Sequence, residues 1–322
     1  MKALIALTIV GLASVAYFGL YTEENSALQA EFQSFIQNYK ANYANSAEFE
    51  FRMKAFEKNL ETIAQMNEEN PLATFGVNQF ADRTEEEMQA MLTKRGFGDH
   101  EGCDDISPSA DLVDVDWRDL MGTPKNQGSC GSCWAFATTA VTEGRYALFQ
   151  GQKQVTTRFS EQSLVDCDTR YNAGCNGGEE YLAFQYWEQN DVVLESDYPY
   201  KGRDGTCQEA HATGIRVKTC TNLNANNKEI VSELQNGPVD IGVDASRWSF
   251  YRKGVMTSCP GRGNNHAVTL VAYTAPQSAN EVATVTIRNS WGEDWGEKGH
   301  IRLPFDSDNC GWQDDVHSIY FE

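Results

Sequence analysis

The sequence predicts an α+β protein in which helical patterns come first and strand-like patterns dominate the last third. Helix formers with apolar side chains at helical spacing extend from about residue 28 to residue 67. A second helical stripe of small and apolar residues begins near Ala137. Strand-like runs rich in β-branched residues occupy positions 267–273 and the segment that ends at Asn289.

The N-terminus has the pattern of a secretory signal peptide. Lys2 precedes an apolar stretch that reaches about Val15, and Ser14-Val15-Ala16 is a small-x-small cleavage site. We therefore expect residues 1–16 to be removed on the secretory route. The alternative is a membrane anchor, because apolar residues continue to Tyr21, although a span usually needs about 20 of them. No other segment is long and apolar enough to cross a bilayer.

The cysteine count and the net charge restrict the classes of protein that fit. Nine cysteines on an oxidising route fit four disulfides and one thiol kept for chemistry. The alternative is a structural zinc site made of Cys130 and Cys133 with Cys167 or Cys175. The net charge of −20 would repel nucleic acid and anionic membrane surfaces, so we expect neither as a partner.

One cysteine lies where a reactive thiolate is favoured. Cys133 follows a Gly-rich loop and precedes the helical stripe, so it would feel the positive end of the helix dipole. That effect is worth only about 0.3–2 kcal/mol, so strong activation also needs a cationic partner. Of the five histidines, His266 stands out because it directly precedes a strand-like run. A third polar residue, Asn289, ends the next run and begins the segment Asn-Ser-Trp-Gly.

These three segments resemble the catalytic blocks of the papain family of cysteine peptidases. His266 and Asn289 follow Cys133 by 133 and 156 residues, and the family signature has about 130–150. This combination leaves little room for the zinc alternative. The upstream helix would by itself be an ordinary amphipathic helix, but it also resembles the cathepsin L-like propeptides. All six positions of their Glu-Arg-Phe-Asn-Ile-Asn signature match, at Glu48, Arg52, Phe56, Asn59, Ile63 and Asn67. Their Gly-x-Asn-x-Phe-x-Asp element matches at residues 76–82.

The resemblance implies a two-domain papain-like fold preceded by a helical propeptide. A helical half would carry Cys133, and an antiparallel β-barrel-like half would carry His266 and Asn289. We expect an inhibitory propeptide at 17–108, which runs backwards through the cleft until acid loosens it, and a peptidase domain at 109–322. The Gly-rich, charged stretch at 94–100 fits an exposed processing linker.

The resemblance also implies a role for each residue of the site. Cys133 would attack as thiolate beside the His266 imidazolium, and Asn289 would orient the imidazole under the cover of Trp291. Gln127 and the Cys133 backbone N–H would bind the oxyanion. Taken singly, each of these residues has an ordinary structural reading, as half a disulfide, a turn residue or a core histidine. The family pattern further implies three disulfides, Cys130–Cys175, Cys167–Cys207 and Cys259–Cys310, with an additional Cys103–Cys220 bridge.

The departures from the family pattern concern substrate choice. We call the pocket for the substrate residue two positions before the scissile bond the specificity pocket. Backbone of Gly177 and Gly178 would hold the extended substrate, and acidic residues then follow where apolar ones are common. The resemblance assigns four residues to this pocket: Glu179, Glu180, Gly242 and Asp315. Asp315 would form the floor, and Gly242 would leave space at the back wall. Asn265 would lie next to the catalytic histidine. This set predicts that Arg or Lys is accepted as well as bulky apolar side chains; the alternative is that both glutamates point into solvent.

The sequence therefore predicts a cysteine endopeptidase made as a zymogen in the secretory pathway, acting in a lysosome- or vacuole-like compartment or outside the cell. No metal and no organic cofactor is expected, and the mature enzyme would be a monomer without a membrane span. Its expected partners are protein and peptide substrates, its own propeptide and cystatin-like inhibitors. A catalytically silent binding protein would be expected to lack Cys133, His266 or Gln127, and all three are present. Peptide ligation through the same acyl-enzyme is the other alternative.

Overall fold

We analysed a computed structural model of the chain. It describes residues 26–93, 103–106, 112–170, 172–223, 226–259, 263–307 and 309–322. The predicted signal peptide and the predicted processing linker at 94–100 lie outside the described residues. The chain divides into two compact units, Met1–Ala64 with Val77–Arg83, and Gln65–Gly76 with Thr84–Glu322. Each unit is described by itself.

The first unit is helical, but the long helical pattern is broken into two helices. Residues 26–39 form one helix, and α2 (Ser46–Glu69), whose last turns belong to the second unit, forms the other. The break begins at Lys40, whose φ of 52° is incompatible with a continuing right-handed helix. The two helices share an aromatic core in which the rings of Phe32 and Phe56 lie 5.3 Å apart. The sequence pattern therefore predicted the helical character correctly and missed the turn.

Side chains of α2, together with Tyr43, hold a turn at residues 76–83, whose alternating residues are typical of a strand. Asn59 donates from Nδ2 to two backbone carbonyls of this segment, each at 2.8 Å, and Arg52 donates to the carbonyl of Asp82 at 3.2 Å. Tyr43 donates to the Asp82 carboxylate at 2.9 Å. The strand β1 (Ala73–Phe75) ends before this turn begins, so the alternating pattern after it does not form a strand.

The second unit has one long buried helix and several short ones. The central helix begins at Cys133, and most of its residues, polar ones included, are buried. Short helices begin at residues that suit helix N-termini, as at Thr84 and Asn226, which both form capping boxes. The helices are α3 (Glu85–Gln89), α4 (Arg118–Met121), α5 (Cys133–Phe149), α6 (Glu161–Cys167), α7 (Glu180–Gln189), α8 (Asn227–Leu234) and the 3₁₀ turn η1 (Asn309–Gly311).

The sheet of the second unit runs β2-β4-β10-β5-β7-β8-β9, with β3 paired to β7. Its pairings are antiparallel except between β2 and β4. Within the described residues this order is linear, so the predicted barrel-like half is an open sheet rather than a closed barrel. The strands are β2 (Asp104–Asp105), β3 (Val115–Asp116), β4 (Thr219–Asn222), β5 (Val239–Val243), β7 (His266–Thr274), β8 (Thr284–Arg288), β9 (His300–Pro304) and β10 (Val316–Tyr320); β6 (Tyr251–Gly254) pairs with β1 in a separate two-stranded sheet.

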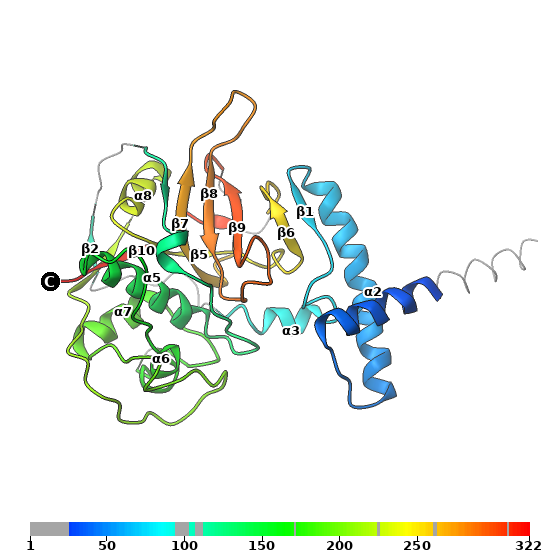
Figure 1. Cartoon of the computed structure of the whole chain (residues 1–322), viewed down its shortest axis with the longest axis horizontal. Coiled ribbons are helices and arrows are strands. Elements are labelled where there is room, and N and C mark those ends of the chain that lie inside the picture. The colour runs from blue at the N-terminus through cyan, green and yellow to red at the C-terminus, as the bar shows by residue number, and fades with distance from the viewer. Residues whose placement is uncertain are drawn as a thin grey trace, which may run out of the picture. The chain divides into compact units, whose positions relative to one another are not determined.

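The helical and sheet parts of the second unit meet along α5. Helices α5, α6 and α7 gather on one side and strands β5, β7, β8 and β9 on the other (Figure 1). Buried apolar residues from both parts, such as Trp134, Val141 and Ala267, form one continuous core. Because α5 starts at Cys133 and the neighbouring strand β7 starts at His266, this packing brings the two predicted catalytic segments to one end of the interface.

Four disulfides join eight of the nine cysteines. They are Cys130–Cys175, Cys167–Cys207, Cys259–Cys310 and Cys103–Cys220. Cys133 is the one cysteine outside a disulfide. The three pairs implied by the family pattern and the additional pair are therefore all present in the structure.

Candidate active site

Cys133 is positioned by a helix start and a disulfide. It is the first residue of α5, directly after the N-cap residue Ser132, and its side chain is fully buried. The preceding turn is held to the opposite loop by the Cys130–Cys175 disulfide and by the bond from Gly131 N–H to the Cys175 carbonyl, 3.1 Å. A thiol at this position lies at the positive end of the α5 dipole, which favours the thiolate.

His266 and Asn289 form a hydrogen-bonded pair at the ends of two neighbouring strands. His266 begins β7, Asn289 directly follows β8, and His266 Nε2 lies 2.8 Å from Asn289 Oδ1. Because Oδ1 only accepts, this bond places the imidazole proton on Nε2. The other nitrogen, Nδ1, is buried with no hydrogen-bond partner among the described residues. A lone pair on Nδ1 is what a base for the Cys133 thiol requires.

Aromatic rings cover the imidazole. The Trp291 ring stacks on His266 with ring centroids 5.2 Å apart, and Trp248 meets the imidazole edge-on at 6.3 Å. Both tryptophans and His266 are completely buried. Burial disfavours the imidazolium and lowers the pKa of His266 to about 4, although the bond to Asn289 works in the opposite direction.

Gln127 is held by the segment that carries Asn289. Its Oε1 accepts from Ser290 Oγ at 2.6 Å, and its backbone N–H donates to the Ser290 carbonyl at 2.9 Å. Its Nε2 is thereby turned the other way, toward the carbonyls of Met91 and Cys130 at 3.1 and 3.0 Å. The sequence indicated Gln127 but gave no signal for Ser290, whose hydroxyl fixes which end of the amide acts as donor.

The chain's own residues 91–93 occupy the neighbourhood of this donor. The Met91 carbonyl accepts from Gln127, and Thr93 Oγ1 donates to the Gly131 carbonyl at 2.7 Å. The Thr93 carbonyl also lies against Gly177, where a Cβ would overlap it. The segment thus contacts both the predicted oxyanion donor and the predicted substrate-binding glycine. Sequence reasoning anticipated a blocking segment but could not say which residues of it lie there.

The predicted pocket residues are buried, and the acidic ones lie close together. Glu179 and Glu180, at the start of α7, are 6% and 0% exposed, and Asp315 is 2% exposed. Their carboxylate oxygens lie within 4.8 Å of one another. The alternative in which the glutamates point into solvent is therefore wrong. Asp314 is exposed, so of the two neighbouring aspartates Asp315 is the one turned inward.

The predicted open space at Gly242 is filled. A Cβ built on Gly242 would lie 2.6 Å from Nδ2 of Asn264. Asn264 also donates from Nδ2 to Asp315 Oδ2 at 2.5 Å. The expectation of a roomy back wall is corrected by this side chain, which reaches in from the loop before β7. Gly178 packs against Trp134 and Asn172 in the same unit.

A further histidine is buried beside the acidic residues. His317 is fully buried, with Nδ1 3.4 Å from Asp240 Oδ2 and Nε2 3.5 Å from Asp315 Oδ1. Its ring stacks on Tyr181 at 5.7 Å. Glu180, Asp240 and His317 bring potential ligand atoms within 4.8 Å of one another, a donor set of the kind that divalent cations use. Two strands that the sequence pattern does not connect, β5 and β10, bring Asp240 and His317 together.

Asn265 serves the loop before β7. Its Oδ1 accepts from the Ala245 N–H at 2.9 Å, and its Nδ2 donates to Ser246 Oγ at 2.8 Å and to Asp244 Oδ1 at 3.3 Å. These bonds tie the residue before His266 to the turn after β5. Asn265 therefore supports the position of the imidazole through the backbone.

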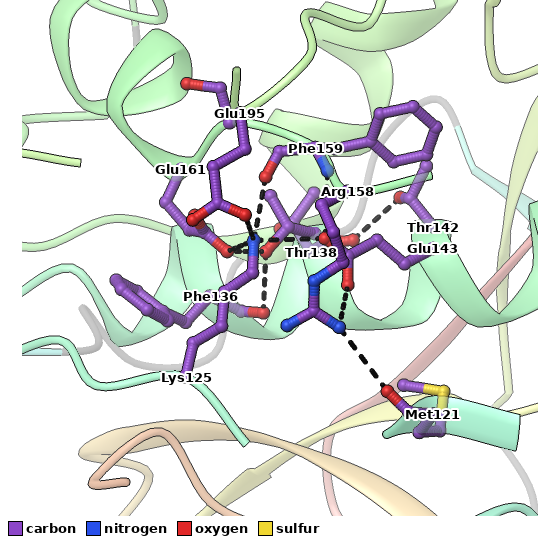
Figure 2. A network of polar contacts seen from close by, with 12 residues as sticks. Met121, Lys125, Phe136, Thr138, Thr142, Glu143, Arg158, Phe159, Glu161 and Glu195 are labelled. Atoms are coloured by element: carbon purple, nitrogen blue, oxygen red, sulfur yellow. Dashed lines mark hydrogen bonds and ion pairs between the residues drawn. The ribbon is translucent and has the colours of Figure 1, made fainter. Parts of the chain in front are cut away.

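A buried ionic network anchors the segment that carries Gln127. Figure 2 shows the Lys125 ammonium among Glu143, Glu161 and Glu195, at Nζ–O distances of 3.0, 2.7 and 3.1 Å. Burial lowers the pKa of Lys125, but Glu143 and Glu161 more than offset this, so the pKa is raised. The Lys125 carbonyl accepts from the Gly292 N–H at 3.0 Å. Lys125 therefore joins the ionic network, through its side chain, to the segment that follows Asn289, through its backbone. Sequence reasoning did not single out Lys125.

The comparisons with known proteins agree with this arrangement. The profile of the papain family cysteine proteases matches residues 113–320, and that of the cathepsin propeptide inhibitor domain matches residues 32–88. A viral cathepsin of Orgyia pseudotsugata multicapsid polyhedrosis virus is 32% identical over 98% of both chains. Cysteine protease XCP2 of Arabidopsis thaliana is 34% identical over 87% of this chain and 82% of its own. The structure of digestive procathepsin L2 proteinase from the Tenebrio molitor larval midgut superposes with a TM-score of 0.83, at 29% identity, over 91% of this chain and 100% of its own.

The chain belongs to the papain family of cysteine proteases. Within that family it is a cathepsin L-like protease synthesised with an inhibitory propeptide domain. Among the described residues no helix has the length and apolar character needed to cross a membrane.

Proposed function

We propose that the protein is a cysteine endopeptidase whose nucleophile is Cys133 and whose acid–base group is His266. Asn289 orients the imidazole, and Gln127 Nε2 with the Cys133 N–H stabilises the oxyanion. The observation that carries this proposal is the bond between His266 Nε2 and Asn289 Oδ1, which leaves Nδ1 without another hydrogen-bond partner among the described residues and available as a base.

The reaction proceeds in two halves. The Cys133 thiolate forms a bond to the scissile carbonyl carbon, and the carbonyl electrons move onto oxygen, where Gln127 donates a hydrogen bond. The intermediate collapses as the C–N bond breaks, and the His266 imidazolium gives its proton to the departing amine. A water then attacks the thioester while His266 takes its proton, and the acid product leaves as the thiolate is restored.

In the zymogen, the Met91 carbonyl occupies the oxyanion donor of Gln127. Burial of His266 favours the neutral imidazole, so the thiolate–imidazolium pair is disfavoured while the imidazole stays buried. Removal of the propeptide would admit water and a substrate carbonyl to Gln127 in place of the Met91 carbonyl.

The test is acid activation of the full-length chain in mild reductant, followed by the hydrolysis of fluorogenic peptides. Cys133→Ser should abolish turnover while the chain folds with the same far-UV spectrum. Gln127→Ala should lower kcat by about 10²–10³ with a smaller change in KM, because oxyanion donors act mainly on the transition state. Full activity of Cys133→Ser after acid treatment would refute the assignment of the nucleophile.

We further propose that the specificity pocket accepts Arg or Lys as well as bulky apolar side chains. Support comes from the burial of Glu180 and Asp315, which would present carboxylates to an entering cation. One charge-assisted hydrogen bond there is worth about 1.5–3 kcal/mol when desolvated. The test compares kcat/KM for two peptides that differ only in Phe or Arg at this position. A Phe preference above about a hundredfold would exclude the acidic-pocket proposal and leave the peptidase intact.

The Cys103–Cys220 bridge supports a proposal for the position of the processing cut. Cys103 is bridged to Cys220, and the strand after it, Asp104–Asp105, pairs with β4. A cut at the expected boundary near residue 108 would leave a remnant tied to the enzyme. We therefore propose that the mature chain keeps Cys103 and starts upstream of it, which intact mass measured with and without reductant would test. A peptide released only by reductant would contradict this start.

The proposed setting is the secretory pathway, ending in a lysosome- or vacuole-like compartment or outside the cell. The support is the N-terminal sequence pattern at 1–16 together with four disulfides, which persist in oxidising compartments. The mature enzyme is proposed to be a monomer open to cystatin-like inhibitors. Size-exclusion chromatography and titration with a cystatin test these two points.

A further inference from the structure

We propose that Asn264 determines specificity by holding Asp315 and filling the space at the back wall of the specificity pocket, which limits how well basic side chains are accepted. The inference rests on the proposed function of that pocket. It assigns to Asn264 a role that the sequence pattern did not indicate.

The geometry places the Asn264 amide where a basic substrate group would need to bind. Its Nδ2 donates to Asp315 Oδ2 at 2.5 Å, the same kind of N–H to carboxylate bond that a guanidinium or ammonium would make. The same amide occupies the space in front of Gly242, which lacks a Cβ that would collide with it. An entering Arg side chain therefore meets a carboxylate that already has a donor, and the space at the back wall of the pocket is already filled.

The far side of Asp315 is also engaged. Its Oδ1 lies 3.5 Å from His317 Nε2, and Nδ1 of that ring lies 3.4 Å from Asp240. Of these neighbours, His317 and Asp240 come from strands of the sheet, whereas Asn264 comes from a loop. Asn264 is therefore the partner of Asp315 whose side chain can be removed without altering a strand.

The amide of Asn264 is anchored at one end only. Its Oδ1 is buried and has no hydrogen-bond partner among the described residues. A basic side chain must displace one good hydrogen bond to reach Asp315, so Asn264 should reduce selectivity for Arg by about tenfold. Removal of the amide should uncover the carboxylate and raise Arg acceptance by that factor.

The experiment measures kcat/KM for the Arg and Phe peptides with Asn264→Ala, normalised to active sites titrated with a thiol-directed affinity label. We expect the Arg-to-Phe ratio to rise about tenfold. Asn264→Leu is the matched comparison, because it loses the donor and keeps the volume over Gly242; its ratio should rise, but by less than that of Asn264→Ala. In an Asp315→Asn background, Asn264→Ala should give no rise. Asn264→Gly provides the same comparison if Asn264→Ala yields no titratable enzyme.

Each result decides one point. An unchanged or lower Arg-to-Phe ratio in Asn264→Ala overturns the inference, and a lower ratio would mean that Oδ1 receives the substrate cation. A rise that persists without Asp315 overturns the part played by the hydrogen bond. Wild-type enzyme that hydrolyses neither peptide defeats the proposed function itself, whereas wild-type activity on Phe with no effect of Asn264→Ala defeats only the inference.

Discussion

Replacement of His300 by Asn should remove part of the acid sensitivity of the zymogen. His300 begins β9, is 5% exposed, and donates from Nδ1 to the Lys298 carbonyl at 2.9 Å. Burial, reinforced by Arg288, lowers its pKa to about 4 from an ordinary 6.5. Between these values the unfolded state binds the proton and the folded state does not, so stability falls as the pH falls through this window. Asn keeps a donor near the position of Nδ1 and does not titrate.

The magnitude follows from the two pKa values. Between pH 7 and pH 5 a histidine shifted from 6.5 to about 4 lowers the free energy of unfolding by about 2 kcal/mol. Urea unfolding in the Cys133→Ser background, followed by tryptophan fluorescence, measures it, and all tryptophans lie at residues 117–312. Between pH 7 and pH 5, the free energy of unfolding of His300→Asn should fall by about 2 kcal/mol less than that of the Cys133→Ser reference. His211→Asn, whose imidazole is 93% exposed, is the matched control and should lose as much as the reference. Equal losses in all three proteins would refute the reasoning.

Three further predictions concern stability. Lys125→Met leaves buried Glu161 without its cation and should destabilise the second unit by about 3–5 kcal/mol in urea unfolding; a loss below about 1 kcal/mol would show that the network contributes little. The Cys103→Ser, Cys220→Ser double variant opens a 117-residue loop, and its free energy of unfolding should be lower by about 2–4 kcal/mol. An equal Tm in the variant and the wild-type protein would contradict this. Asn59→Ala leaves two backbone carbonyls without their donor, so the free energy of local opening of the turn that Asn59 holds should fall by about 1–3 kcal/mol. Amide hydrogen exchange in this turn should then be faster, and an unchanged exchange rate would contradict the prediction.

Local patterns predicted the elements that carry the chemistry. The periodicity indicated a helix near Ala137 and a strand over 267–273, and the structure has both, starting slightly earlier at Cys133 and His266, because helix and strand periods are set by neighbours along the chain. Local patterns predicted the wrong structure where side chains distant in the sequence determine the backbone conformation. The alternating residues after β1 form a turn, because Asn59 supplies donors to their carbonyls. The helical run breaks at Lys40, where composition alone gave no stop signal.

The specificity pocket also separates what the sequence predicts from what only the tertiary structure decides. Sequence comparison proposed Glu180 and Asp315, yet it also proposed open space at Gly242, which the Asn264 side chain fills. It assigned the pocket floor to Asp315, and in the structure Asp315 is buried and Asp314 exposed, because β10 starts at the next residue and its register decides which side each faces. The burial of His317 beside Asp240 depends on the pairing of β10 with β5.

The sequence by itself determined the family, the order of the catalytic blocks, the helix that begins at Cys133 and the strand that begins at His266. Each of these is encoded in residues that are close along the chain or in spacings characteristic of a family. Only the tertiary structure decided which carbonyl meets Gln127 and which amide meets Asp315. Such contacts join residues 36 and 51 positions apart, and they depend on how whole elements pack. Hydrogen bonds act over about 3 Å, so the identity of a buried partner is settled only when the packing is complete.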